Sequence, residues 1–258
     1  VIARSEGSYL VDVEGNRILD LAAGQFCNII GHNHPVFVED LIAELRNNLH
    51  TGSQYVTTRV LETAKEVTGI TPEGLDNVIL LSTGSESNEF AMRVAKACTN
   101  RTGIVGFDRG YYGISLATRA LSALSDGKVE YGPRPPDSGR IIAPNCLRCP
   151  VHLSYPECKL ACFDLSTRLI GNGAENVAAI IVETIVSAGG MLYPTAEYFQ
   201  ALRAFADEIG ALLIVDEAQT GFGRCGTWFD CENLGLKPDI LVFSKTSGNG
   251  YPSSGVVI

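Results

Sequence analysis

The fold of this chain is decided by two stretches, ALLIVDEAQTGFGR at residues 211–224 and DILVFSKTSGNGYP at residues 239–252. Each begins with a short apolar run, continues into charged or polar side chains, and then reaches glycine. A short apolar run bounded by turn residues is typical of a strand that is buried on both faces, as in a parallel sheet covered by helices. The two stretches therefore predict an α/β fold.

The rest of the chain repeats this pattern, because apolar runs alternate with longer segments of helical period. We predict strands at 77–81, 102–107, 177–182, 211–215 and 240–243, and helices at 86–98 and 196–209. Near the N-terminus, the segments 8–12 and 17–20 flank Glu14-Gly15-Asn16, which is a β-hairpin signal. From the Gly/Pro-rich residues 132–136 to about Leu160 we predict a long irregular connection.

The composition of the chain indicates which classes of binding partner to expect. With 45% hydrophobic and 19% charged residues, the chain has the composition of a globular protein. The formal net charge of -9 would repel a phosphate backbone, so we expect no nucleic-acid partner. The longest apolar runs are far shorter than the roughly 18 residues needed to cross a bilayer, so we expect no membrane span and a cytoplasmic protein.

The eight cysteines fall into two groups. Four are scattered through apolar or motif segments and are interpreted as reduced thiols, namely Cys27, Cys98, Cys225 and Cys231. The other four are closely spaced, as Cys146, Cys149, Cys158 and Cys162. This spacing fits a structural zinc held by four thiolates. The connection between the two pairs is tight and His152 has no partner, so plain loop cysteines are the favoured interpretation and zinc is the alternative.

Polar groups follow several predicted strands, and ligands of open α/β sheets bind outside the carboxyl ends of strands. Residues 80–89, LLSTGSESNE, form a strand that enters a helix through Gly84. Free backbone N–H groups and the helix dipole favour a phosphate at such a place. Thr83 followed by Glu86 is equally an ordinary capping box, so the two interpretations stay open here.

The two stretches quoted first carry the remaining chemistry. Asp216 and Glu217 follow five apolar residues, and buried carboxylates are costly unless something pairs with them. A magnesium ligand pair is one explanation, but the usual phosphate-loop spacing is missing; a protonated pyridine nitrogen calls for one carboxylate, such as Asp216. Lys245 also follows an apolar strand, and a deprotonated Lys amine forms Schiff bases. A solvated Lys at a strand end is the alternative.

Together these segments resemble the class III aminotransferases, which are fold type I enzymes that depend on pyridoxal 5'-phosphate. The matching motifs lie at residues 31–35 (GHNHP), 82–89 (STGSESNE), 111–113 (YYG), 182–183 (VE), 216–224 (DEAQTGFGR) and 244–246 (SKT). The most specific feature of the resemblance is the pair Asp216 and Lys245, which are 245 - 216 = 29 residues apart and lie in the last two of these motifs. In the family the loop with His32 and His34 is structural, so we predict no metal there.

The resemblance implies pyridoxal 5'-phosphate as cofactor and a role for each matching residue. Lys245 would carry the cofactor and act as general base, while Asp216 would keep the pyridine nitrogen protonated so that the ring is an electron sink. The other implied roles are phosphate binding by Thr83, Gly84 and Ser85, ring stacking by Tyr111, a hydrogen bond from Gln219 to the phenolic oxygen, positioning around Gln219 by Glu183, and a place for Gln25 beside the substrate bond to be broken.

The implied reaction moves an amino group from an amino acid or amine to a 2-oxo acid, in a homodimer. Within the family, the motifs of this chain are most similar to those of the 2,2-dialkylglycine decarboxylases. Decarboxylation-dependent transamination is therefore the alternative reaction. Those relatives carry two Ser where this chain has Ser187 and Ala188, and one hydroxyl is therefore missing. Transamination is accordingly the first hypothesis.

Compared with the family, the chain is short. We expect residues 1–35 to be an N-terminal segment of the small domain and residues 36–258 to be an incomplete cofactor-binding large domain, with the C-terminal small domain absent. Relatives carry a cofactor-phosphate Thr and a substrate-carboxylate Arg in the part that is missing here. A truncated product without catalytic activity is therefore a further hypothesis.

Overall fold

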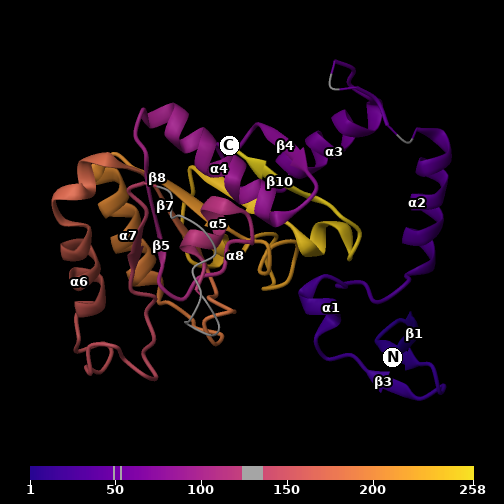
Figure 1. Ribbon diagram of the computed structural model, residues 1–258, viewed down its shortest axis with the longest axis horizontal. Coiled ribbons are helices and arrows are strands. Elements are labelled where there is room, and N and C mark those ends of the chain that lie inside the picture. Colours follow the sequence, from indigo (N-terminus) through magenta and orange to yellow (C-terminus); the bar gives the residue numbers. More distant parts are fainter. Residues whose placement is uncertain (49, 53, 124–135) are drawn as a thin grey trace.

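The computed structural model describes residues 1–48, 50–52, 54–123 and 136–258, and their main feature is a seven-stranded sheet (Figure 1). In spatial order the strands are β4 (Val78–Leu81), β10 (Ser254–Val257), β9 (Ile240–Phe243), β8 (Leu212–Asp216), β7 (Val177–Glu183), β5 (Gly103–Phe107) and β6 (Gly139–Ile141). Only β10 runs antiparallel to its neighbours; the other adjacent strands are parallel. The α/β fold with a mostly parallel sheet is confirmed.

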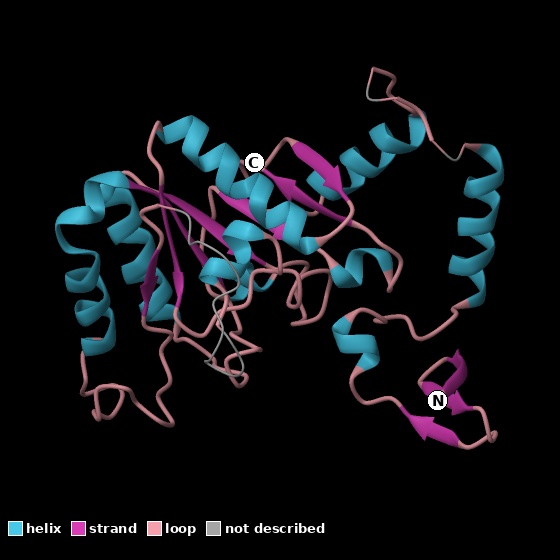
Figure 2. Cartoon of the chain, in the orientation of Figure 1, coloured by secondary structure: helices cyan, strands magenta, loops and turns pink. Residues whose placement is uncertain are grey.

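Helices cover both faces of this sheet (Figure 2). One face is covered by α4 (Gly84–Thr99) and α5 (Leu116–Leu121), and the other by α3 (Thr58–Thr68), α6 (Ala161–Ile170) and α7 (Ala196–Ile209). Along β8, Leu213 and Val215 belong to one hydrophobic cluster, whereas Leu212 and Ile214 face the other. This two-sided burial explains why the strand is apolar at every position except its last.

Local signals at both ends of α7 show why this helix forms where it does. The Thr195 side chain accepts a hydrogen bond from the Tyr198 backbone N–H at 3.3 Å and so caps the first turn. Gly210 ends the helix with φ of 66°, which glycine adopts without steric cost. The helix packs Tyr198, Phe199, Leu202 and Ala206 against the sheet.

The N-terminal part lies apart from the main sheet, at the right of Figure 1. It contains the antiparallel strands β1 (Ile2–Glu6), β2 (Tyr9–Asp12) and β3 (Arg17–Leu19), followed by the short α1 (Ala23–Phe26) and by α2 (Pro35–Asn47). The predicted hairpin is therefore confirmed, with β1 added to it. The Asp12 carboxylate closes the turn by accepting hydrogen bonds from the backbone of Glu14 and Asn16.

The predicted strands and helices are all present, with ends within two residues of those expected. The long irregular connection is partly wrong, because β6 lies within it and pairs with β5. This edge strand has three residues, one of them Arg140, so it gives no apolar run; residues 132–135 lie outside the described part of the chain. The shorter elements are η1 (Gly171–Asn176), α8 (Asp230–Asn233) and η2 (Lys245–Gly248).

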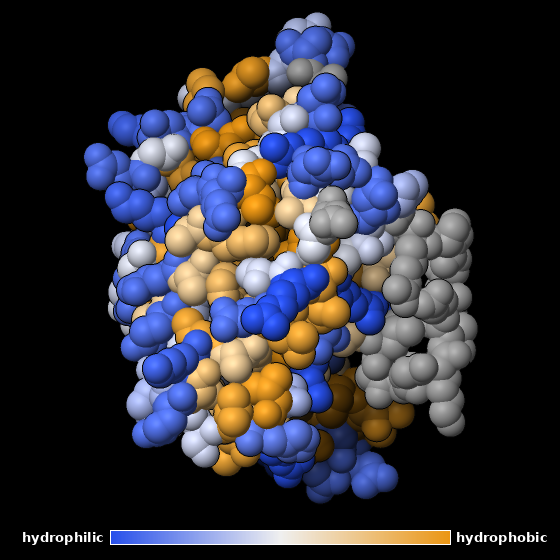
Figure 3. All heavy atoms as spheres, turned by 90° about the vertical axis from the view of Figure 1, so that its left-hand side faces the viewer, coloured by the Kyte–Doolittle hydropathy of each residue, from blue (hydrophilic) through white to orange (hydrophobic). Residues whose placement is uncertain are grey.

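The surface over α6 and α7 mixes hydrophilic and hydrophobic side chains (Figure 3). Leu169 of α6, for example, is 64% exposed, whereas Leu213 in the sheet is fully buried. Among the described helices, none has both the length and the apolar composition needed to cross a membrane.

The contrast between these two leucines gives a stability prediction. Leu213→Ala should lower the free energy of unfolding by about 2 to 5 kcal/mol, because it removes buried methyl groups and leaves a cavity. Leu169→Ala, the matched control, should change it by less than about 0.5 kcal/mol. Urea unfolding curves of the two variants measure the difference. Equal losses in both would contradict the burial described for β8.

Candidate active site

The carboxyl ends of the sheet strands surround a cavity of about 270 Å³. All nine residues for which the sequence predicts a site role line this cavity: Gln25, Thr83, Gly84, Ser85, Tyr111, Glu183, Asp216, Gln219 and Lys245. They come from the ends of β4, β7, β8 and β9, from the segment after β5, and from α1. The structure therefore brings together side chains that lie up to 220 residues apart in the chain.

The start of α4 combines the two interpretations that the sequence left open. Thr83 caps the helix by accepting from the Glu86 backbone at 3.2 Å, and Glu86 accepts from the Thr83 backbone, which completes a capping box. The next two residues, Gly84 and Ser85, line the cavity, and N–H groups in the first turn of a helix have no intrahelical acceptor. The capping box thus leaves the N–H groups of Gly84 and Ser85 beside the cavity, in an arrangement that suits an anion.

Asp216 is the last residue of β8, lines the same cavity and is 5% exposed. Its Oδ2 accepts a hydrogen bond from Asn88 Nδ2 at 2.7 Å, and its Oδ1 accepts one from the Ala218 N–H at 2.9 Å. Burial raises the pKa of Asp216, while these two hydrogen bonds and the charge of Lys245 oppose the rise. Among the described residues no Lys, Arg or His forms an ion pair with it. A cationic ligand group would supply that missing charge.

Glu217 does not share this environment, although it is the next residue. Its two carboxylate oxygens accept from Thr220 Oγ1 at 2.5 Å, from the Asp230 N–H at 3.0 Å and from the Cys231 N–H at 2.7 Å. Glu217 therefore fixes the start of α8 and does not line the cavity. Because Asp216 lines the cavity and Glu217 does not, the two carboxylates do not form the pair that the magnesium explanation requires.

Glu183 and Ser187 connect the residues along one side of the cavity. Glu183 accepts a hydrogen bond from the Tyr111 N–H at 2.8 Å and another from the Ser187 backbone. The Ser187 hydroxyl donates to Gln219 Oε1 at 2.6 Å, which leaves the Gln219 amide N–H groups available as donors. Burial, and then the nearby Asp216 charge, raise the pKa of Glu183 to about 8, so Glu183 is a neutral acid near pH 7.

The two remaining predicted site residues, Gln25 and Lys245, both lie on backbone with a positive φ. Gln25 lies in a left-handed turn in which Ala23, Gly24, Gln25 and Phe26 have φ of 47°, 58°, 58° and 69°. Such a conformation costs roughly 1 to 2 kcal/mol for each residue with a side chain, and strain of this kind clusters at functional sites. Lys245 also has a positive φ, of 50°.

The Phe26 carbonyl ties this turn to the Lys245 segment. It accepts hydrogen bonds from Arg224 Nη2 and from Thr246 Oγ1, both at 3.1 Å. Because Thr246 follows Lys245 directly, the same contact places Gln25 and Lys245 at one cavity. Of the two histidines nearby, His32 has a contact at both ring nitrogens: its Nε2 lies 2.7 Å from Asp20 Oδ2, and Asn28 contacts its Nδ1.

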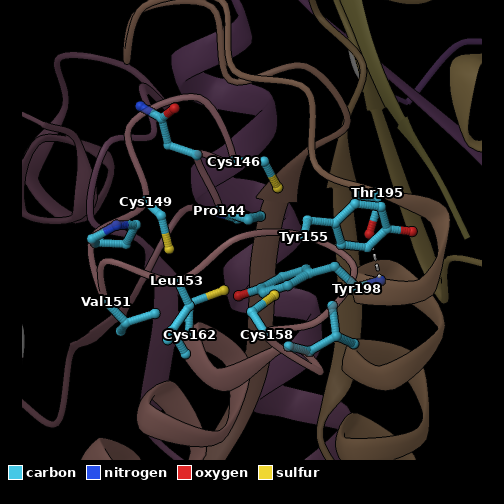
Figure 4. A pocket seen from close by; sticks show the side chains of 13 residues that line it. Pro144, Cys146, Cys149, Val151, Leu153, Tyr155, Cys158, Cys162, Thr195 and Tyr198 are labelled. Atoms are coloured by element: carbon cyan, nitrogen blue, oxygen red, sulfur yellow. Dashed lines mark hydrogen bonds between the residues drawn. The ribbon is translucent and has the colours of Figure 1, made fainter.

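The four closely spaced cysteines line a separate, smaller pocket beside Tyr155 and Tyr198 (Figure 4). The four are Cys146, Cys149, Cys158 and Cys162. All are free thiols, and they do not form a group that could hold a metal ion. The zinc alternative therefore has no support from the geometry.

Four further polar residues line the cavity, namely Asn88, Tyr112, Thr220 and Ser244. Each lies within one of the family motifs, but the sequence predicts no role for it. Asn88 follows Gly84 by four residues on one helix and so shares its face, which is the signal that the sequence offers.

The comparison with known proteins decides the family. The sequence profile of the Aminotransferase class-III family matches residues 1–258. The chain belongs to the class III aminotransferase family. An uncharacterised aminotransferase of Schizosaccharomyces pombe is 35% identical over the whole chain, and a 5-aminovalerate aminotransferase of Pseudomonas aeruginosa is 35% identical over 99% of it.

Solved structures agree with this assignment of the fold. An amine transaminase from an uncultivated Pseudomonas species, solved in its PLP-bound form, superposes with a TM-score of 0.92 at 29% identity over the whole chain. The class III chain spans 58% and 60% of the lengths of the two relatives and 61% of the solved chain.

The decarboxylase alternative gains no support from these findings. The relatives reported above are aminotransferases or transaminases by name. Gln25 does line the cavity, but Ala188, on which the comparison with decarboxylases depended, is not among its lining residues.

The environment of Glu217 predicts a pH dependence of stability. Burial raises its pKa from 4.5 to about 7. Its contribution is complete below the unfolded pKa and is lost as the pH rises towards about 7, because the unfolded chain ionises first. The stability advantage of the wild type over Glu217→Gln, measured by urea unfolding, should be larger near about pH 5 than near about pH 8. An advantage that grows with pH would show that the sign is wrong.

Proposed function

We propose that the full-length protein is a pyridoxal 5'-phosphate-dependent aminotransferase that moves an amino group from an amino acid or amine to a 2-oxo acid. One observation carries the proposal. Asp216, a buried carboxylate with no ion pair in the described structure, lines the same cavity as Lys245 and the N–H groups of Gly84 and Ser85 at the start of α4. Membership of the class III family supports the same reaction.

The groups around the cavity fit the four polar parts of this cofactor. The start of α4 suits the phosphate, Asp216 suits a protonated ring nitrogen, the free amide N–H groups of Gln219 suit the phenolic oxygen, and the Lys245 amine suits the aldehyde. Tyr111 is the aromatic residue available for stacking, and it is 37% exposed. The donor set is thus complementary to the cofactor in charge and in hydrogen bonding.

When bound, the cofactor supplies an electron sink for negative charge that develops on the substrate Cα. Lys245 would hold the cofactor covalently and, once released by the substrate amine, would move the proton at Cα. Asp216 would keep the ring nitrogen protonated. Glu183, as a neutral acid, would hold the Tyr111 backbone without adding a second negative charge beside Asp216.

We propose the same organisation of the whole protein that the family resemblance implies. Residues 1–35 would belong to the small domain, residues 36–258 to the large domain, and the active protein would be a homodimer. Several large apolar side chains of the N-terminal part are well exposed, among them Leu21 (88%), Val36 (62%), Tyr55 (68%) and Leu61 (60%). A second copy covering this region would bury them.

The covalent role of Lys245 can be tested by reduction with borohydride. Wild-type full-length protein incubated with pyridoxal 5'-phosphate and reduced should gain the mass of one cofactor, less the water lost when the Lys245 amine condenses with the aldehyde and plus the two hydrogens added by reduction. Lys245→Ala should gain none. Lys237→Ala, which removes an exposed Lys, is the matched control and should be labelled like the wild type. Undiminished labelling of Lys245→Ala would refute the assignment.

The role of Asp216 predicts an order of rates. Asp216→Asn should lower kcat about ten- to hundredfold, because a hydrogen bond to a charged group is worth roughly 1.5 to 3 kcal/mol. Tyr111→Phe keeps the aromatic ring and should lose less. Steady-state rates of the two variants with one amino donor and one 2-oxo acid decide this; small and equal losses would count against an electrostatic role for Asp216.

A further inference from the structure

Asn88 makes the only side-chain hydrogen bond to Asp216 among the residues that the structure describes. It lies on the inner face of α4, is 1% exposed, and follows Gly84 by four residues. Its Nδ2 donates to Asp216 Oδ2 at 2.7 Å and to the Tyr112 carbonyl at 2.8 Å. One amide group thus joins α4, the end of β8 and the segment after β5.

The orientation of this amide is determined by its neighbours. If the Asn88 oxygen and nitrogen were exchanged, the oxygen would face two acceptors, the Asp216 carboxylate and the Tyr112 carbonyl. Tyr112 is itself held in place, because its hydroxyl accepts from the Phe107 N–H at 2.9 Å and donates to the Ile181 carbonyl at 3.0 Å. The donor group of Asn88 must therefore face Asp216.

This arrangement leaves a buried polar atom without a partner. Asn88 Oδ1 is buried and accepts no hydrogen bond in the described structure. Such an atom is unfavourable, and an apolar side chain at this position would avoid it. A requirement for a donor at Asp216 accounts for the asparagine.

The second donor to Asp216 does not link the carboxylate to α4. It is the N–H of Ala218, two residues along the same turn, so it cannot hold β8 against α4. Among the described hydrogen bonds of Asp216, only the one from Asn88 reaches α4, whose first residues line the same cavity. This contact therefore links the carboxylate at the end of β8 directly to the helix.

We propose that Asn88 is a positioning residue that holds Asp216 as an oriented carboxylate and thereby sets how tightly the site binds pyridoxal 5'-phosphate. The inference rests on the proposed function, because it assigns to Asp216 a cationic ring nitrogen as partner. It adds a residue that acts through Asp216 and needs no contact with the substrate.

The test compares three variants of the full-length protein. Asn88→Leu removes the donor at similar size, and Asn88→Asp keeps the shape but places a second carboxyl against Asp216. Ser87→Ala is the matched control, since Ser87 is the neighbouring buried residue, bonds to Ser254 at 2.8 Å and does not line the cavity. The measured quantities are the Kd for pyridoxal 5'-phosphate between about pH 6 and about pH 9, and the thermal unfolding midpoint without cofactor.

Near neutral pH, Asn88→Leu should raise the Kd about ten- to hundredfold, and Ser87→Ala should leave it unchanged. The ratio of the Asn88→Leu Kd to the wild-type Kd should shrink as the pH rises, because Asp216 without its donor then regains its charge. For Asn88→Asp the ratio should shrink as the pH falls, because the introduced carboxyl, once protonated, can donate to Asp216. A merely structural role would not produce opposite pH trends.

Three results would overturn the inference. A wild type that does not bind the cofactor removes the proposed function, and the inference with it. A wild type that binds, together with an Asn88→Leu variant of unchanged Kd, overturns the inference alone. If Asn88→Leu does not fold, Asn88→Asp decides, and a Kd ratio independent of pH in that variant overturns the inference.

Discussion

The site depends on one constraint, which is the burial of a carboxylate at the end of the central strand β8. A buried charge is costly unless donors and a countercharge surround it. Asp216 has two donors, from Asn88 and from the Ala218 N–H, and no ion pair within the described structure. Asn88 on α4 supplies one of these donors, and under the proposed function the cationic ring nitrogen of the cofactor would complete the environment.

The two adjacent carboxylates illustrate how one sequence feature serves two purposes. Glu217 accepts hydrogen bonds from Thr220 and from the first residues of α8, so its role is to hold the following loop. That loop carries Arg224, which contacts the Phe26 carbonyl. The residue beside the cavity carboxylate thus secures the segment that brings the N-terminal turn to the same cavity.

The left-handed turn at Ala23–Phe26 and the positive φ of Lys245 store strain on opposite sides of one contact. The Phe26 carbonyl accepts from Arg224 and Thr246, and these hydrogen bonds offset part of that strain. Packing of this kind allows Gln25, from a part of the chain that lies mostly outside the main sheet, to line a cavity built by the strand ends.

The sequence alone determined the main strands, α4, α7 and the hairpin, since periodicity and turn residues report local burial. Through the family resemblance around Asp216 and Lys245 it also predicted nine site residues, and the structure places all nine around one cavity. Only the tertiary structure decided what depends on contacts between distant segments. It added the edge strand β6, separated the surroundings of Asp216 and Glu217, and showed that the capping box at the start of α4 lies beside the cavity. The hydrogen bond between Asn88 and Asp216 joins residues 128 positions apart, and no local pattern encodes such a pair, because its geometry arises only when the helix packs on the sheet.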